Sequence, residues 1–195
     1  MIRLFTALCK SILEILTDED IFLLANEDYR HGREACPCCG AVGQLYSYGD
    51  YSRDLTYLKA GKVTYSRINP LRFICGSCGA THAMLPDIVI PYGRYSLGIV
   101  LAALIAYFER ATTVVKICEN FGIAVSTIYE WKKRMLSHKE LMLGLLISRK
   151  TPALAFLRGL IGSNSLSESL SRFFRKYGFS FMQNKSILTS RSRPP

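Results

Sequence analysis

The chain has 195 residues, of which 49% are hydrophobic and 21% are charged. This composition is ordinary for a globular protein and excludes a disordered or collagen-like chain. The longest apolar run, at 97–108, covers 12 residues, fewer than the roughly 18 that a membrane-spanning helix needs. We therefore expect a folded chain that has no membrane partner.

The net charge of +10 belongs entirely to the second part of the sequence. Residues 1–110 carry 11 basic and 11 acidic side chains, whereas residues 111–195 carry 14 basic and only 4 acidic ones. Because neutralising phosphates releases condensed counterions, we expect nucleic acid as the partner, ahead of an anionic membrane surface; the helix-turn-helix predicted for residues 94–136 favours double-stranded DNA over RNA. The alternative is a basic surface that only keeps the protein soluble.

The first segment, residues 1–34, is predicted to be helical, because apolar side chains such as Ile2, Phe5 and Leu8 recur near helical spacing. Lys10 interrupts this apolar stretch too early for a secretory signal. We therefore expect a cytoplasmic protein, associated with the nucleoid through DNA. In a reducing compartment, the seven cysteines indicate a metal site rather than a disulfide framework.

The next segment, residues 35–93, is predicted to form a small antiparallel sheet. Short runs rich in Tyr, Val, Ile and Thr alternate there with turn signals such as Ala60-Gly61 and Asn69-Pro70. We place strands near residues 44–49, 52–58, 62–68, 71–75 and 80–85.

Two Cys-x-x-Cys-Gly motifs, at 36–40 and 75–79, flank these strands. Such paired motifs are typical of a zinc ribbon, in which each motif supplies two thiolates and its glycine permits a tight turn. The predicted ligands of one structural Zn²⁺ are Cys36, Cys39, Cys75 and Cys78. A shell of four cysteines leaves no open position for a substrate, so the ion is expected to stabilise the fold rather than to catalyse a reaction.

Some features of this site leave alternatives open. Cys38 competes with its neighbours in the first motif, and we choose Cys36 with Cys39 because that spacing matches the second motif. His82 is an alternative fourth ligand, although we expect it to be a strand residue. The 35 residues between the motifs exceed the common 15 to 20, which leaves room for an extra hairpin. Four buried cysteines without a metal, or a redox-active thiol pair, are the remaining alternatives.

Residues 94–136 are predicted to form a helix-turn-helix with Gly122 in the turn. In this arrangement Ile117, Ile128 and Trp131 are buried, and the opposite face of the second helix enters the major groove. Polar side chains on that face would contact bases, and its cations would contact phosphates. The predicted DNA-binding residues are Val125, Ser126, Tyr129, Glu130, Lys132, Lys133 and Arg134.

The sequence allows a second starting point for the second helix of this motif. Ala124 stands where a capping serine is usual, and Thr127 with Glu130 forms a capping box that would start the second helix later. Apolar residues around a glycine also occur in plain helical bundles, which is the alternative fold for this segment.

The remainder is predicted to be a helical extension, residues 137–182, and a disordered basic tail, residues 183–195. Apolar side chains recur at helical spacing along the end of the extension. Such a stripe forms either core or a dimer face, so a homodimer through the C-terminal helices is a possible partner arrangement. The stripe consists of Leu166, Leu170, Phe173, Phe174 and Tyr177.

The two motifs together resemble the zinc-ribbon and helix-turn-helix front end of bacterial insertion-sequence transposases, and more closely an uncharacterised bacterial family of transposase-like proteins. The resemblance lies in residues 36–40, 48–53, 72–79, 81–86 and 91–96. These transposases cut and join DNA with three carboxylates and two metal ions on a ribonuclease-H-like domain. Beyond Arg134 the sequence holds only two carboxylates, Glu140 and Glu168, so the resemblance implies DNA recognition without transposition chemistry.

We therefore predict an α+β fold, with a small β zinc ribbon followed by an all-α helix-turn-helix and a helical extension. The predicted function is sequence-specific DNA binding without enzyme activity. One alternative is a protein-interaction module in which the five tyrosines between residues 46 and 65 form the docking surface. Others are the DNA-binding subunit of a transposase whose catalytic chain is separate, and a nuclease with an unrecognised site.

Overall fold

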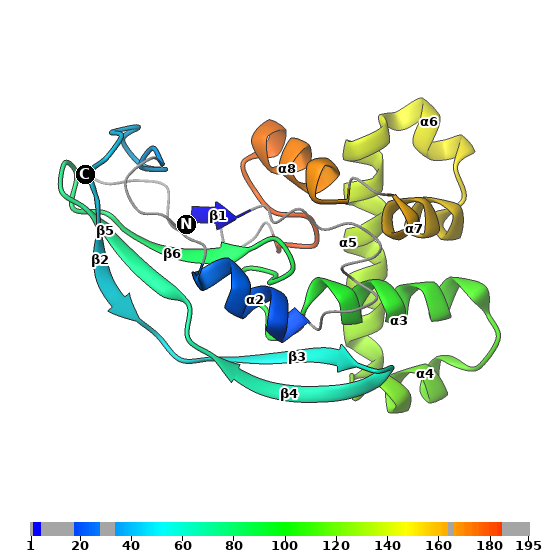
Figure 1. The fold of residues 1–195 in the computed structure, drawn as a ribbon. Helices are drawn as coiled ribbons and strands as arrows, with labels where there is room; N and C mark the ends of the chain where they lie inside the picture. The colour runs from blue at the N-terminus through cyan, green and yellow to red at the C-terminus, as the bar shows by residue number, and fades with distance from the viewer. Residues whose placement is uncertain (1, 5–17, 28–33, 164–165, 185–195) are drawn as a thin grey trace.

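The computed structural model describes residues 2–4, 18–27, 34–163 and 166–184. A region of sheet is followed by a group of helices, as the predicted α+β class requires (Figure 1). The strands are β1 (Ile2–Leu4), β2 (Leu45–Asp50), β3 (Arg53–Lys59), β4 (Lys62–Ile68), β5 (Leu71–Cys75) and β6 (Thr81–Pro86). The helices are α2 (Asp18–Glu27), α3 (Leu97–Glu109), α4 (Val114–Phe121), α5 (Val125–Leu143), α6 (Leu145–Lys150), α7 (Ala153–Gly162) and α8 (Leu166–Tyr177).

The larger sheet has the strand order β1-β6-β5-β2. Strands β2, β5 and β6 pair antiparallel, as predicted, whereas β1 pairs parallel with β6, with Ile2 opposite Met84. The expectation of a helix from residue 1 is therefore wrong for Ile2–Leu4, which forms a strand; residues 5–17 of that segment lie outside the described residues. Apolar spacing over a few residues does not distinguish a helix from a strand, and pairing with β6 decides the outcome.

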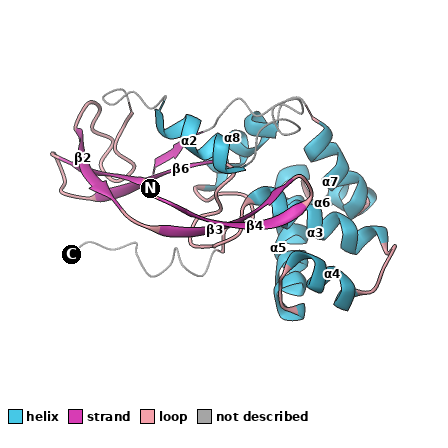
Figure 2. Cartoon of the chain, turned by 60° about the horizontal axis from the view of Figure 1, so that its bottom comes forward, coloured by secondary structure: helices cyan, strands magenta, loops and turns pink. Residues whose placement is uncertain are grey.

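Strands β3 and β4 form a separate hairpin whose closed end reaches the helices (Figures 1 and 2). One face of the hairpin buries Leu55 and Tyr57 in a small core shared with α2. On the other face, Leu58 and Val63 pack against the core of the helical region. The hairpin thus joins the predicted zinc-ribbon and helix-turn-helix segments through apolar packing rather than through a linker.

The helical core surrounds α3, whose side chains at Ile99, Val100, Ala103 and Leu104 are completely buried. Helix α5 runs on to Leu143, so the predicted boundary between residues 136 and 137 falls inside one continuous helix. The described helices contain no stretch with the length and apolar character of a membrane span.

The predicted stripe on α8 belongs to this core, because Leu166, Leu170 and Phe173 are buried within the chain itself. Gln183 is also fully buried, and its Oε1 accepts a 2.9 Å hydrogen bond from the amide of Ser180. The predicted start of a disordered tail at residue 183 is therefore too early, while residues 185–195 lie outside the described part of the chain.

Candidate metal centre and nucleic-acid interface

The two cysteine motifs fold into matching turns. In the first turn, the amide of Gly40 donates to the carbonyl of Cys36 at 2.8 Å, and the amide of Cys36 donates to the carbonyl of Ala41 at 2.9 Å. The equivalent bonds in the second turn measure 2.8 and 3.0 Å. Gly40 and Gly79 have φ angles of +76° and +69°, a conformation that glycine adopts without steric cost.

Strand pairing brings the two turns together. The first turn leads into β2 and the second follows β5, and these strands pair with Leu45 opposite Cys75. The amide of Gly76 adds a 2.8 Å bond to the carbonyl of Gln44. The sheet therefore brings both cysteine pairs to one of its ends. Cys36 and Cys78 meet there although they are 42 positions apart in the sequence.

The sulfur atoms of Cys36, Cys39, Cys75 and Cys78 all lie within 4.8 Å of one another. The distances from Cys36 Sγ to Cys78 Sγ and from Cys39 Sγ to Cys75 Sγ are 3.8 and 3.7 Å. A tetrahedral zinc ion with bonds of about 2.3 Å requires sulfurs about 3.8 Å apart, whereas a disulfide requires about 2.05 Å. The four free thiols thus have the composition and the spacing of a zinc site.

The backbone around the sulfurs favours negative charge at one of them. The amides of Cys78 and Ser77 outweigh burial and lower the pKa of Cys75 to about 6. The amide of Ala80 lowers the pKa of Cys78, but burial and the neighbouring sulfurs outweigh it and raise that pKa to about 12. Four thiolates so close together repel one another, and a divalent cation among them supplies the charge that stabilises all four.

His82 and Cys38 lie beside this cluster. Among the described residues the cluster comprises only the four cysteines, so the structure places Cys38 outside it and groups Cys36 with Cys39. His82 lies on β6, as expected, and its Nε2 is 3.2 Å from Cys36 Sγ. Burial lowers the pKa of His82, which favours a neutral ring that can donate an Nε2 hydrogen to a ligand sulfur.

The turn between α4 and α5 has the predicted geometry. Gly122 ends α4 with a φ of +60°, and its amide donates back to the carbonyls of Cys118 and Glu119. Helix α5 begins at Val125 and follows Ala124, which supplies no side-chain cap. The later start suggested by the capping box at Thr127 is therefore wrong, because the backbone enters the helix before that residue.

The two helices divide their side chains between core and surface. Ile117, Ile128 and Trp131 are 2%, 0% and 6% exposed, as the helix-turn-helix prediction requires. Five of the seven predicted DNA-binding side chains are exposed in the first turns of α5, and their spacings of three and four residues place them on one helix face. They are Val125, Ser126, Tyr129, Glu130 and Lys133.

The two other predicted DNA-binding side chains contact the chain itself. Lys132 Nζ donates to the hydroxyl of Tyr107 at 2.9 Å and lies 5.0 Å from the centre of that ring. Arg134 Nη1 donates to the carbonyl of Met182 at 3.2 Å, and burial lowers the pKa of its guanidinium. The structure therefore separates these two from the exposed face on which Lys133 lies.

Other cations of the second half are also engaged within the chain. Lys139 is buried, and its Nζ donates to the carbonyls of Ser148 and Thr151 at 2.9 and 2.5 Å. Arg158 and Arg172 pair with Glu109 and Glu168 at 2.7 and 2.8 Å. Several of the basic side chains that the structure describes in this half are therefore paired or bonded within the chain, which no sequence count reveals.

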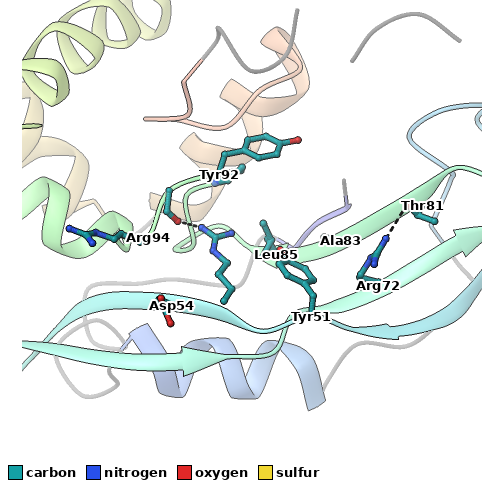
Figure 3. A pocket seen from close by; sticks show the side chains of 11 residues that line it. Tyr51, Asp54, Arg72, Thr81, Ala83, Leu85, Tyr92 and Arg94 are labelled. Carbon is teal, nitrogen blue, oxygen red and sulfur yellow. Dashed lines mark hydrogen bonds between the residues drawn. The ribbon is translucent and has the colours of Figure 1, made fainter. Parts of the chain in front are cut away.

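A surface pocket of about 640 Å³ lies between the sheet and the loop at residues 91–94 (Figure 3). Its lining includes Arg53, Arg72 and Arg94 together with Tyr51 and Tyr92. Arg53 has a structural role, because its guanidinium donates to the carbonyls of Ile90 and Gly93 and thereby connects the loop to β3. Arg72 and Arg94 line opposite ends of this pocket in Figure 3.

Sequence reasoning did not identify two contacts of the α4–α5 region. Tyr129 packs edge-to-face on Tyr107, with ring centres 6.1 Å apart. Tyr65, at the closed half of the β3–β4 hairpin, brings its hydroxyl beside the turn, where a Cβ atom on Gly122 would lie 2.9 Å away. Tyr65 lies in the predicted strand 62–68 and among the five tyrosines of the docking alternative, but the sequence did not show which surface it meets.

Comparison with known proteins gives one family match, to part of the chain. No curated protein and no protein of solved structure matches the chain. A family model does match a segment that begins at the first cysteine of the metal cluster and ends at Trp131 on α5. Residues 36–131 are thus similar to a domain of unknown function, DUF6431.

Proposed function

We propose that the protein binds double-stranded DNA in a sequence-specific manner, with α5 in the major groove and one structural zinc ion in the sheet. The observation that carries this proposal is the division of α5 into a buried face and an exposed polar face directly after an αL turn at Gly122. Recognition helices contact base edges with residues of their first turns. Ser126 and Tyr129 occupy these turns and expose hydroxyl groups.

The proposal assigns a role to each of the five predicted side chains that are exposed in the first turns of α5. Ser126 and Tyr129 donate to or accept from base edges, and Glu130 accepts from a cytosine amino group. Lys133 contacts a phosphate, and Val125 contacts a thymine methyl group. The chain would act as a transposase-like DNA-binding protein without catalytic activity, in which the zinc site holds the β2–β5–β6 sheet that supports the hairpin.

The experiment is selection from a random duplex pool, followed by titration of the enriched duplex at several salt concentrations. For the Ser126→Ala and Tyr129→Phe variants, the difference in binding free energy between the enriched and a scrambled duplex is expected to decrease by about 1–3 kcal/mol. This is the discrimination that one well-placed base contact usually contributes. Ser137→Ala is the matched control, because Ser137 is exposed on the same helix about 16 Å further along.

Wild-type protein that enriches no motif would contradict sequence-specific binding. An enriched motif that binds both variants and the control equally would contradict the assignment of Ser126 and Tyr129 to base reading. Addition of a strong chelator is expected to abolish binding, because the metal-free sheet no longer supports the hairpin that packs on the helical core.

A second candidate function is protein interaction through the sheet. Tyr46 and Tyr48 on β2 are 54% and 52% exposed, and aromatic side chains are enriched at protein interfaces. Of the five tyrosines considered, however, Tyr57 is buried. Weak duplex binding that does not depend on salt would favour this candidate over DNA binding.

A further inference from the structure

The β3–β4 hairpin is fixed beside the α4–α5 turn. Leu58 and Val63, which pair with each other across the hairpin, pack against the helical core. Two residues further along β4, the hydroxyl of Tyr65 lies next to Gly122, although 71% of the Tyr65 side chain is exposed. Figures 1 and 2 both place the closed end of the hairpin against the helices. The position of this end relative to α5 is therefore set by packing.

The closed end carries two lysines and no acidic residue. Lys59 and Lys62 are exposed and form the last pair of the hairpin, joined by Ala60 and Gly61 with φ angles of +48° and +74°. Like charges directly opposite one another destabilise a hairpin. Among the described residues Glu19 interacts electrostatically with Lys59, but its carboxylate accepts hydrogen bonds from Tyr57 and Ser66.

The two lysines have a geometry suited to a phosphate backbone. Phosphate contacts position a protein on a duplex, and two-stranded ribbons are one of the elements that proteins place against DNA grooves. A helix in the major groove has a strand of phosphates along each side, because that groove is only about 12 Å wide. A ribbon that ends beside the N-terminal part of the groove helix lies where one of those strands passes.

We infer that the tip of the β3–β4 hairpin, Lys59 and Lys62, is a second DNA contact, made to phosphates that flank the groove occupied by α5. This inference rests on the proposed function and extends it from one recognition helix to a helix and a ribbon. The tip contributes affinity and orientation but no base recognition. Leu58 and Val63 pack the ribbon against the helical core, so that the two contacts keep one relative geometry.

The test compares two variants that each lose two positive charges. Lys59→Gln with Lys62→Gln removes them from the hairpin tip, and Arg149→Gln with Lys150→Gln removes them from α6, at the opposite end of α5 (Figure 1). Each variant is titrated with the enriched duplex and with a scrambled duplex as a function of salt. Thermal unfolding confirms that both are folded, and Lys59→Arg with Lys62→Arg restores the tip charges.

The tip variant is expected to reduce the slope of log K against log salt by about 1.8, which corresponds to two phosphate contacts. The loss of affinity should be equal for both duplexes, so that sequence preference is unchanged. The α6 variant and the arginine variant should retain the wild-type slope.

An unchanged slope in the tip variant, or an equal decrease in the tip and α6 variants, would overturn the inference. Self-association of the tip variant at an unchanged slope would also overturn it, because lysines on exposed strands commonly prevent association between sheet edges. Failure of the wild-type protein to bind duplex would overturn the proposed function as well. A tip variant that binds like wild type, while Ser126→Ala loses sequence preference, would overturn only the hairpin contact.

Discussion

Replacing Gly122 with alanine is expected to destabilise the protein for two separable reasons. The φ angle of +60° at Gly122 places the residue in the left-handed region, which costs an ordinary residue roughly 1–2 kcal/mol. The new methyl group would also lie 2.9 Å from the Tyr65 hydroxyl oxygen, closer than carbon and oxygen normally approach. The turn therefore depends on glycine through both its backbone and its surroundings.

The expected loss in the free energy of unfolding follows from these two contributions. Alanine makes the unfolded chain less flexible than glycine does, which offsets about 0.4–1 kcal/mol of the backbone cost. Tyr65 is exposed and can rotate away, at the roughly 0.5–1.5 kcal/mol of a displaced side chain. We expect a net loss of about 2 kcal/mol, which in a chain of this size lowers Tm by roughly 4–8 °C.

The assay is urea unfolding of Gly122→Ala, Tyr65→Phe and the double variant. Because Tyr65→Phe removes the atom that the methyl group would meet, the double variant should recover roughly 0.5–1 kcal/mol relative to additivity. Gly159→Ala is the control, since Gly159 lies inside α7 with open space around it; alanine there should stabilise the helix by about 0.5–1 kcal/mol. No cost at Gly122, or perfect additivity with Tyr65→Phe, would refute the described turn.

Three further predictions concern the metal cluster, a buried lysine and a carboxylate. Elemental analysis should find one zinc ion per chain, lost in Cys39→Ser and retained in Cys38→Ser; loss in both variants would contradict the ligand set. Lys139→Met should lower the free energy of unfolding by about 2–3 kcal/mol in urea, because it removes a charged donor from the buried carbonyl of Ser148 and the part-buried carbonyl of Thr151. Hydrogen bonds from side chains of the hairpin, Ser66 first, lower the pKa of Glu19 below 4.5, so its stabilisation is present above pH 4.5 and is lost as the pH falls through the folded pKa. The stability difference between wild type and Glu19→Gln should therefore be largest at neutral pH and should decrease as the pH falls below 4.5, and a difference independent of pH would contradict this linkage.

Local signals predicted most of the elements and the metal cluster. The five strands between residues 44 and 86 match their predicted segments to within one residue, because period-two alternation and the turns between strands depend on adjacent residues. The grouping of Cys36 with Cys39 also follows from local spacing, since a Cys-x-x-Cys-Gly turn closes on itself. The αL turn at Gly122 was also predictable from local sequence, because its hydrogen bonds connect residues three to five positions apart.

Contacts between distant residues could not be predicted in this way. The pairing of β1 with β6 joins Ile2 to Met84, and no pattern in either segment identifies the other. Lys132 and Arg134 were predicted to contact phosphate from their charge alone, whereas the structure gives them partners 25 and 48 residues away. Whether a cation faces solvent or a carbonyl of its own chain depends on which elements pack around it.

The sequence by itself determined the chemistry of this protein: four thiols in two self-closing turns, a glycine-centred turn between two helices, and a surplus of positive charge. These features depend on side-chain type and on hydrogen bonds between near neighbours, so they are specified before the chain folds as a whole. Only the tertiary structure decided that the β3–β4 hairpin lies beside Gly122 and that several cations face inward. Packing of apolar side chains such as the partly buried Leu58 and Val63 against the helical core determines that placement, and the hydrophobic effect is non-directional and sums over the whole core.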